Sequence, residues 1–296
     1  AANHAIAAAD LVIAIGSRFG DRQTGNLDKY TENTKFIHID IDPAEIDKNV
    51  GNSLGLAGDM KTILALLMRH EPNSALTDWW QQIDKWEESY AYDYHQSRLT
   101  VPWAMHQVMQ RTKGKPYAFA TDVGQHQMWA AQFFKVYKPR HFLTSGGQGT
   151  MGYGLPAALG AKVGCPDSPV VLFSGDGSIM MNCQEFATIA DNDIDVKVVV
   201  IRNEILGMVG QWQRLFYNHH YSQSELKGKT DLVKLAEAMG VKGYRLTKKE
   251  ELETRLPEIL SEKGAVLIDV VIPEEEDVLP MVPGGKRLDQ MVLGYL

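Results

Sequence analysis

Cysteine is scarce in this chain: it occurs twice in 296 residues, at Cys165 and Cys183, without a CxxC pair or a metal-ligand spacing. So little cysteine is typical of a reducing compartment, and we expect the cytoplasm. The sequence also lacks an apolar run of about 18 residues, which excludes a membrane-spanning helix. A formal net charge of −7 argues against nucleic acid or an anionic membrane surface as the main partner.

What is present is the composition of a soluble globular protein, with 44% hydrophobic and 23% charged residues. Short apolar runs alternate with helical stretches, which predicts an α/β protein with two doubly wound parallel-sheet domains. The predicted strands cover 11–15, 36–41, 54–57, 117–122, 142–145, 170–174, 196–201 and 265–272. Helices are predicted over 43–50, where Pro43 suits a first helical turn, and over 60–70.

Turn-rich and polar segments predict the domain boundaries. The first α/β segment covers 1–73 and ends in the turn-rich Glu71-Pro72-Asn73-Ser74. A polar, tryptophan-bearing helical connector covers 74–100, and a second α/β domain covers 101–296. The chain begins in a helical stretch that runs straight into a strand, without initiator methionine or signal peptide, so we expect a fragment of a longer protein.

The segment 174–203 carries the strongest chemical signal. The strand over 170–174 leads into Gly175-Asp176-Gly177, a helical stretch follows, and the strand over 196–201 ends at Arg202-Asn203. In a right-handed βαβ unit both loops emerge at the carboxyl edge of the sheet, so Asp176 and Asn203 would converge there. These oxygen ligands suit Mg²⁺ completed by a phosphate-bearing ligand. The alternative is a plain Asp-Gly turn after a buried strand.

The block SGDGSIMMNCQEFATIADNDIDVKVVVIRN resembles the thiamine-diphosphate motif, in which GDG is followed by Asn-Asn at this interval. The resemblance implies thiamine diphosphate and Mg²⁺ as cofactors. It implies Asp176, Asn203 and the backbone carbonyl of Ile205 as metal ligands. Arg202 departs from the family, which usually has Asn there, but the ligating position is the second one.

A possible nucleotide site lies in the first segment, where one strand ends in Gly16-Ser17-Arg18-Phe19-Gly20-Asp21-Arg22 and the next in Asp40-Ile41-Asp42-Pro43. An acidic residue at a strand end can accept ribose hydroxyls, and arginine can bind a pyrophosphate. A surface Arg/Asp loop is the alternative, and the GxGxxG fingerprint of dinucleotide sites is missing.

These stretches look like the FAD-binding middle domain of acetohydroxyacid synthase (acetolactate synthase) large subunits, of which 1–73 would be the C-terminal part. The resemblance implies FAD in a non-redox role and favours the biosynthetic branch of the family. The residues that would face FAD are Gly16, Ser17, Arg18, Arg22, Asp40 and Asp59. Gly20 departs from the Asp that is more common there.

Two further blocks resemble the same family, VGQHQMW from Val123 and SGGQGTMGYGLP from Ser145, each after a predicted strand. Glycines at strand-to-helix turns suit close contact with a diphosphate, and His126 could donate to a phosphate oxygen or be a satisfied structural histidine. Gln148 replaces a usual Leu. The cofactor-binding set implied by the resemblance is Gly124, Gln125, His126, Gly149, Met151, Gly175, Asp176, Gly177, Ser178, Asn203, Gly207 and Met208.

The block GMVGQWQ, from Gly207, is the most discriminating part of the resemblance. By similarity Trp212 would line the pocket for the second 2-ketoacid, and Met151 would hold the cofactor in a V shape. Both side chains could instead be ordinary core residues. The residues implied at the reaction centre are Val123, Met151, Met208 and Trp212.

The resemblance implies decarboxylation of pyruvate and ligation to a second 2-ketoacid, pyruvate or 2-ketobutyrate, in branched-chain amino-acid biosynthesis. It implies a homodimer or homotetramer with a small regulatory subunit as a further partner. The family's activating glutamate comes from an N-terminal pyrimidine-binding domain of the partner subunit, and no residue here matches its motif. We therefore expect this chain alone to be inactive.

Three alternatives remain open on the sequence. The chain could belong to another thiamine-diphosphate enzyme, such as a pyruvate oxidase, a benzoylformate decarboxylase or a glyoxylate carboligase, although GMVGQW argues against these. It could be a non-catalytic cofactor-binding module, or a plain nucleotide-binding α/β protein that takes ATP or NAD. The segment 215–230 could be a lid over the site or a mobile loop.

Overall fold

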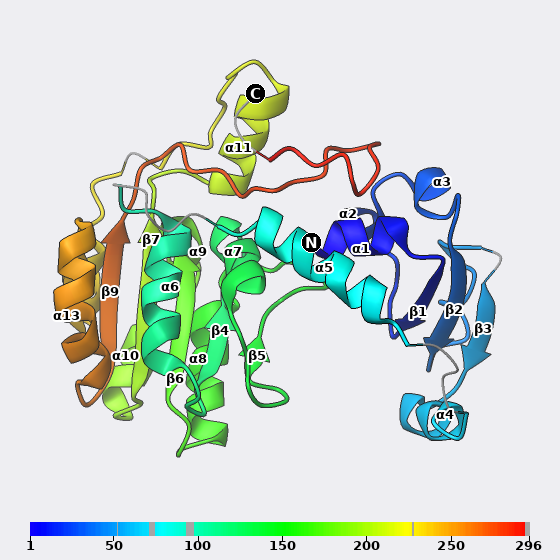
Figure 1. The fold of residues 1–296 in the computed structure, drawn as a ribbon. Helices are drawn as coiled ribbons and strands as arrows, with labels where there is room; N and C mark the ends of the chain where they lie inside the picture. Colours follow the sequence, from blue (N-terminus) through cyan, green and yellow to red (C-terminus); the bar gives the residue numbers. More distant parts are fainter. Residues whose placement is uncertain (52, 71–74, 93–97, 227, 294–296) are drawn as a thin grey trace. The chain divides into compact units, whose positions relative to one another are not determined.

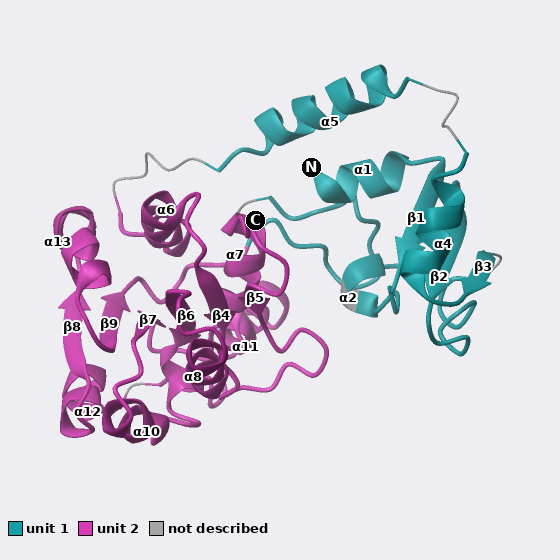
Figure 2. Ribbon diagram, turned by 90° about the horizontal axis from the view of Figure 1, so that it is seen from below, with its two compact units in different colours: residues 1–93, 279–296 teal, residues 94–278 magenta. Residues whose placement is uncertain are grey.

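The computed structural model describes residues 1–51, 53–70, 75–92, 98–226 and 228–293. The chain forms two compact units, residues 1–93 with 279–296 and residues 94–278, which Figure 2 shows in different colours. The predicted boundary at 71–74 lies outside the described residues. Residues 279–296 group with the first unit, whereas the sequence analysis assigned them to the domain that starts at residue 101. The C-terminal segment packs on the N-terminal unit, where the Asn26 N–H donates to the Lys286 carbonyl at 3.1 Å. A contact between residues so far apart in the sequence leaves no local pattern from which it could be predicted.

Unit 1 contains a three-stranded parallel sheet with the order β1-β2-β3. The strands are β1 (Leu11–Ile15), β2 (Lys35–Asp40) and β3 (Leu54–Ala57), close to their predicted ranges. The helices are α1 (Ala2–Ala8), α2 (Asp21–Thr24), α3 (Leu27–Tyr30), α4 (Met60–Leu67) and α5 (Thr77–Ser89). The core of this unit includes Phe19, Tyr30 and Phe36, which pack edge-on or tilted against one another.

The predicted helix over 43–50 is wrong, because these residues form successive turns. The Asp42 carboxylate accepts the Ala44 N–H at 2.9 Å, and the Asp47 carboxylate accepts the Ser53 N–H at 3.1 Å. Asp47 itself has a left-handed backbone with φ 57°. Short acidic side chains that bond to nearby backbone compete with helix formation, and this competition outweighs the favourable Pro43.

Unit 2 contains a six-stranded parallel sheet with the order β5-β4-β6-β7-β9-β8. Its strands are β4 (Ala118–Thr121), β5 (Phe142–Leu143), β6 (Val170–Gly175), β7 (Val196–Arg202), β8 (Lys242–Leu246) and β9 (Val266–Val271). The prediction that the strands at the two ends of segment 174–203 are parallel is confirmed, and the register from Val170↔Val196 to Gly175↔Ile201 makes β6 and β7 direct neighbours. Strand β8 was not predicted, because KGYRL is a polar edge strand without an apolar run.

Helices cover both faces of this sheet (Figure 1). On one face pack α6 (Val101–Thr112), α7 (Gln125–Phe133) and α13 (Lys249–Ser261). On the other pack α8 (Gly154–Gly164), α9 (Asp176–Ile179), α10 (Glu185–Asp191) and α12 (Leu232–Ala238). Helix α11 (Gly207–Phe216) follows β7. The α/β class with two parallel sheets is thus confirmed.

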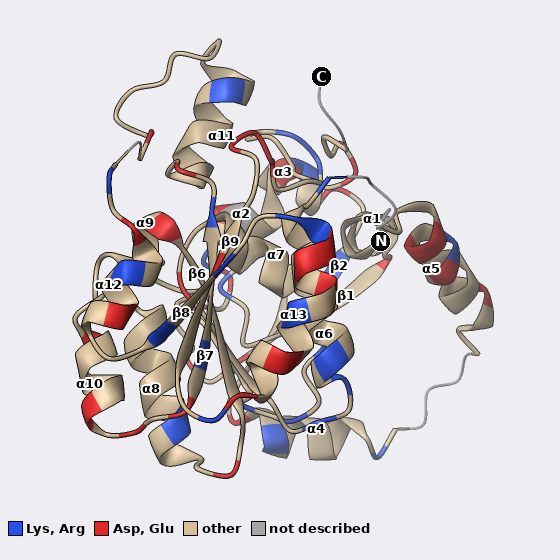
Figure 3. Cartoon of the chain, turned by 90° about the vertical axis from the view of Figure 1, so that its left-hand side faces the viewer, with Lys and Arg blue, Asp and Glu red and all other residues tan. Residues whose placement is uncertain are grey.

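Positions of both charge signs alternate along α13, as Figure 3 shows by colour. Among the described residues, no helix has both the length and the apolarity needed to span a bilayer.

Candidate active site

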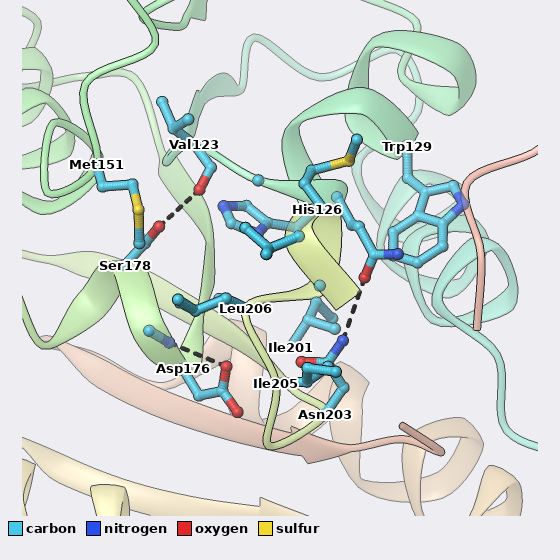
Figure 4. Close-up of a pocket in the computed structure, with 17 residues that line it drawn as sticks. Val123, His126, Trp129, Met151, Asp176, Ser178, Ile201, Asn203, Ile205 and Leu206 are labelled. Atoms are coloured by element: carbon cyan, nitrogen blue, oxygen red, sulfur yellow. Dashed lines mark hydrogen bonds between the residues drawn. The ribbon is translucent and has the colours of Figure 1, made fainter. Parts of the chain in front are cut away.

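The main candidate site of unit 2 lies where the direction of the sheet connections reverses. After β4 the chain adds β5 on one side and β6 on the other, so the carboxyl ends of β4 and β6 flank a topological switch point. Open α/β sheets bind ligands in the crevice at such points. A pocket here is lined by Val123, Gly124, Gln125, His126, Trp129, Met151, Gly175, Asp176, Gly177, Ser178, Ile201, Asn203, Ile205, Leu206, Gly207, Met208 and Val209 (Figure 4).

Asp176 begins α9 directly after β6 and presents its carboxylate beside the loop that follows β7. One carboxylate oxygen accepts the Gly177 N–H at 2.9 Å and the other the Glu204 N–H at 2.7 Å. Burial raises the pKa of Asp176 to about 6, although these N–H groups and the nearby Arg202 charge favour the carboxylate. A bound divalent cation would supply the positive charge that stabilises this buried carboxylate in its ionised form.

Two further oxygen donors come from the loop after β7. The Asn203 side chain is buried and donates through Nδ2 to the Gln125 side-chain oxygen at 3.2 Å, drawn as a dashed line in Figure 4. Ile205 forms an antiparallel bridge with Glu225, but its two bonds use the carbonyls of Glu204 and Ser224, not that of Ile205.

Carboxylate, amide and carbonyl oxygens form the hard donor set that suits Mg²⁺. Within the described part of the chain, no group of three or more His, Cys, Asp or Glu side chains could hold a metal ion. The candidate metal site therefore depends on mixed side-chain and backbone oxygens, not on a cluster of histidines or thiolates.

Arg202, the departure from the thiamine-diphosphate motif, does not line the pocket. Its guanidinium bonds to Glu204 at 2.6 Å and to the buried Asp269 at 3.4 Å. These partners hold the loop that carries Asn203, so the substitution leaves the oxygen donors in place.

His126 on α7 points its ring into the pocket (Figure 4). Burial lowers the pKa of His126 to about 3, so the imidazole is neutral at physiological pH. Its Nε2 is buried and has no hydrogen-bond partner within the described ranges. In a neutral imidazole only one nitrogen carries a proton, so this orphaned atom can donate to a phosphate oxygen in the tautomer that places the proton on Nε2.

A buried carboxylate that the sequence analysis missed ties the pocket walls together. Asp122 directly follows β4. One of its carboxylate oxygens accepts the N–H groups of Val123 at 2.9 Å and Gly152 at 2.8 Å, and the other accepts the Ser174 hydroxyl at 3.3 Å. Gly152 has φ 89°, a conformation that favours glycine. Asp122 thereby fixes the turn next to Met151. The sequence feature that could have indicated this residue is an acidic side chain at the end of a buried apolar strand.

The structure gathers most of the sequence-predicted residues of unit 2 at this pocket, but not all of them. Gly149 lies outside the lining, and its N–H donates to the Ser145 carbonyl at 3.0 Å. Trp212 also lies outside the lining, and its ring packs edge-on against Phe216 with 5.9 Å between centroids. The lining residues that the sequence analysis did not single out are Trp129, Ile201, Leu206 and Val209.

The residues predicted to face FAD lie at or after the carboxyl ends of the strands of unit 1. Gly16 follows β1 and its N–H donates to the Ile39 carbonyl at 2.9 Å. Asp40 ends β2 and is buried, and Asp59 caps α4 by accepting the Thr62 N–H at 3.0 Å. The Ser17 hydroxyl donates to the Gln23 side chain at 3.2 Å. The Arg18 carbonyl accepts the Asn49 side-chain amide at 2.7 Å. Arg22 lies in α2.

Two family models match the chain. The one described as "Thiamine pyrophosphate enzyme, C-terminal TPP binding domain" matches residues 122–270, and "Thiamine pyrophosphate enzyme, central domain" matches residues 1–67. The first match covers all the pocket-lining residues found above.

Curated relatives match nearly the whole chain. It is 42% identical to the acetolactate synthase large subunit of Cyanidium caldarium over 98% of the chain and 51% of that protein. It is 41% identical to the isozyme 3 large subunit of Escherichia coli over 99% of the chain and 53% of that protein. It is 42% identical to the mitochondrial acetolactate synthase catalytic subunit of Saccharomyces cerevisiae over 98% of the chain and 44% of that protein. The chain thus spans about half the length of these relatives.

Proposed function

Because this chain belongs to the thiamine pyrophosphate enzymes, we propose that it is the central and cofactor-binding part of an acetolactate synthase catalytic subunit. The observation that carries the proposal is the convergence of Asp176, Asn203 and Ile205 beside the orphaned Nε2 of His126. Hard oxygen donors next to an unsatisfied buried imidazole suit a divalent cation and an attached diphosphate. The names of the curated relatives supply the reaction.

In this proposal Asp176, Asn203 and the Ile205 carbonyl hold Mg²⁺, and the diphosphate group lies against His126 and Gly124. When bound, thiamine diphosphate supplies an electron sink for the decarboxylation of pyruvate and for ligation to a second 2-ketoacid. The chain contributes binding and orientation: Met151 and Val123 form one wall of the pocket, and Asp122 fixes both by hydrogen bonds to the adjacent backbone.

We place the second 2-ketoacid, pyruvate or 2-ketobutyrate, next to Met208 at the start of α11. Met208 lines the pocket and its flexible thioether side chain suits a small apolar group. Trp212 lies one turn further along the same helix, outside this lining. Its proposed part in selecting the second substrate therefore requires the substrate pocket to extend one helical turn beyond this lining.

For unit 1 we propose FAD in a non-redox role at the carboxyl edge of the β1-β2-β3 sheet. Gly16, Asp40 and Asp59 lie at or just after the carboxyl ends of the three parallel strands, as a nucleotide site of this class requires. We further propose a cytoplasmic homodimer or homotetramer that pairs with a small regulatory subunit. Light scattering on the purified protein, with and without the small subunit, measures this assembly.

Titration calorimetry of this chain with Mg²⁺ and thiamine diphosphate tests the cofactor site. We expect Asp176→Ala to weaken Mg²⁺-dependent binding by at least about 100-fold, or about 2.7 kcal/mol, because it removes the charged ligand. Asp191→Ala, at an exposed end of α10, is the matched control and should bind as the wild type does. Unchanged binding by Asp176→Ala would refute the metal site.

Product analysis tests the reaction. With pyruvate, Mg²⁺, thiamine diphosphate and FAD, we expect the 296-residue chain to bind cofactor without steady acetolactate formation, since it spans about half of its relatives. Steady acetolactate production by this chain alone would contradict the need for a glutamate from another domain. In the complete protein, pyruvate with 2-ketobutyrate should give the mixed acetohydroxy acid, and other products would favour a pyruvate oxidase or glyoxylate carboligase activity.

A further inference from the structure

Three side-chain amides form a continuous buried chain from the pocket to the backbone of residues 276–278. Asn203 donates to Gln125 at 3.2 Å, and Gln125 donates to the Gln211 side-chain oxygen at 2.9 Å. Gln211 is 0% exposed and bonds to the backbone of Val278. Neither Gln211 nor Val278 lines the pocket.

The backbone at the far end determines which way each amide faces. Gln211 accepts the Val278 N–H at 2.9 Å and donates to the Val278 carbonyl at 3.1 Å, so its oxygen and nitrogen cannot be exchanged. Gln125 must direct its NH₂ toward the Glu276 carbonyl, at 3.0 Å, and toward the Gln211 oxygen. The Gln125 oxygen therefore faces Asn203.

Asn203 must in turn offer its NH₂ to Gln125, because the Gln125 oxygen is only an acceptor. Its single side-chain oxygen is then left for the other side of the amide, where a cation would bind. Without these partners the asparagine could turn either its oxygen or its NH₂ toward a cation, and only the oxygen can ligate Mg²⁺.

Gly207 provides the space for this arrangement. A Cβ at position 207 would lie 1.9 Å from the Gln125 side-chain oxygen and 3.1 Å from the Asn203 nitrogen, so any other residue would displace their hydrogen bond. The glycine that opens α11 thus protects the link between Asn203 and Gln125 in addition to any contact it makes with a ligand.

We propose that Gln211 is a positioning residue, which acts through Gln125 to fix the Asn203 amide with its oxygen toward the metal. This inference rests on the proposed Mg²⁺ site and extends it to a residue outside the pocket. Groups that orient metal ligands from behind commonly affect affinity by about 10–100-fold when they are removed. Gln211 acts through one intermediate amide, so a smaller effect is expected.

The test is Mg²⁺ titration calorimetry at a fixed thiamine diphosphate concentration. We expect Gln211→Met to weaken Mg²⁺ binding by about 3–10-fold, since the Gln125 NH₂ group then keeps only its bond to the Glu276 carbonyl. Gln107→Met is the matched control: Gln107 lies on α6 and its side chain accepts a hydrogen bond from Arg111 at 2.7 Å, outside the amide chain. Equal losses in the two variants, or wild-type affinity in Gln211→Met, would overturn the proposal.

Asn203→Asp gives a second test that does not depend on the folding of Gln211→Met. An added carboxylate ordinarily strengthens binding of a divalent cation. Here an aspartate oxygen would face the Gln125 oxygen, which its own partners prevent from turning, so we expect weaker Mg²⁺ binding. Equal or tighter binding would overturn the orientation mechanism. A wild-type chain that binds neither Mg²⁺ nor thiamine diphosphate would refute the proposed function as well, whereas the variant outcomes above refute the amide chain alone.

Discussion

Strands β6 and β1 have similar apolar sequences and both belong to parallel sheets, yet their burial differs sharply. Every residue of β6 except Gly175 is buried, whereas Leu11, Ile13 and Ile15 of β1 are 45%, 51% and 38% exposed within the described chain. Strand β6 lies between β4 and β7 with helices on both faces, and β1 pairs with β2 alone. An apolar run therefore predicts a strand, while its burial depends on the layers that pack against it.

The two units also differ in how far the residues of their candidate sites are satisfied by hydrogen bonds. In unit 2 the loops after β4, β6 and β7 converge on one pocket that holds an orphaned imidazole and a buried carboxylate. In unit 1 the predicted FAD residues engage in local bonds, such as the helix cap at Asp59 and the contact of the Arg18 carbonyl with Asn49. Among the described residues on the strands of that unit, the buried group without a hydrogen-bond partner is His38, which was not among the predicted FAD residues. Unsatisfied buried groups point to a ligand more directly than satisfied ones do.

The largest effect that separates the units is expected at the centre of β6. Leu172 is 0% exposed and packs between β4 and β7. We expect Leu172→Ala to lower the free energy of unfolding of unit 2 by about 2–5 kcal/mol, because it leaves a cavity in a close-packed core. Urea denaturation followed by pulsed hydrogen exchange measures the protection of the backbone amides in β6 and in β1 separately. A loss below that range, with protection of β6 intact, would contradict the central position of this strand.

An intermediate, pH-dependent effect is expected at Glu276. This side chain is 5% exposed and accepts the Val101 N–H at 3.0 Å, and burial raises its pKa from 4.5 to about 7. The folded state holds this proton more tightly than the unfolded state does. The free energy of unfolding therefore declines as pH rises from the unfolded-state pKa of 4.5 to the folded-state pKa of about 7. Glu276→Gln removes this decline. We expect its free energy of unfolding to exceed that of the wild type by about 1–3 kcal/mol at pH 8 and to equal it closely at pH 4.

Thermal unfolding at several pH values measures this difference. The neighbouring Glu275 is exposed, so Glu275→Gln is the matched control and should show no comparable rise in relative stability with pH. A Glu276→Gln variant whose stability follows that of the wild type at every pH would mean that Glu276 ionises without a penalty in the folded state.

The smallest effect is expected in β1. Ile13 is half-exposed, and threonine keeps its β-branched shape. We expect Ile13→Thr to change the free energy of unfolding of unit 1 by less than about 1 kcal/mol, as is usual for surface positions. The same pulsed hydrogen-exchange measurement applies, and a cost close to that of Leu172→Ala would show that β1 is covered in the protein in solution.

The sequence predicted the parts of the site that depend on order along the chain. Strands β6 and β7 were expected to be parallel strands of one βαβ unit, and for that reason Asp176 and Asn203 were expected to converge at one edge of the sheet. The turns over 43–50 were missed because side-chain hydrogen bonds replaced the helix that Pro43 suggested. Asp122 was missed because its partners, Gly152 and Ser174, are distant in sequence.

By itself the sequence determined the chemistry that is available: the oxygen donors, the glycine-rich turns and the family to which they belong. Tertiary structure decided how these groups face one another. The neutral state of His126, the amide orientation from Gln211 to Asn203, and the position of Trp212 outside the pocket lining all depend on contacts between distant segments. Burial and hydrogen-bond direction are properties of the packed environment, and no local pattern of residues encodes them.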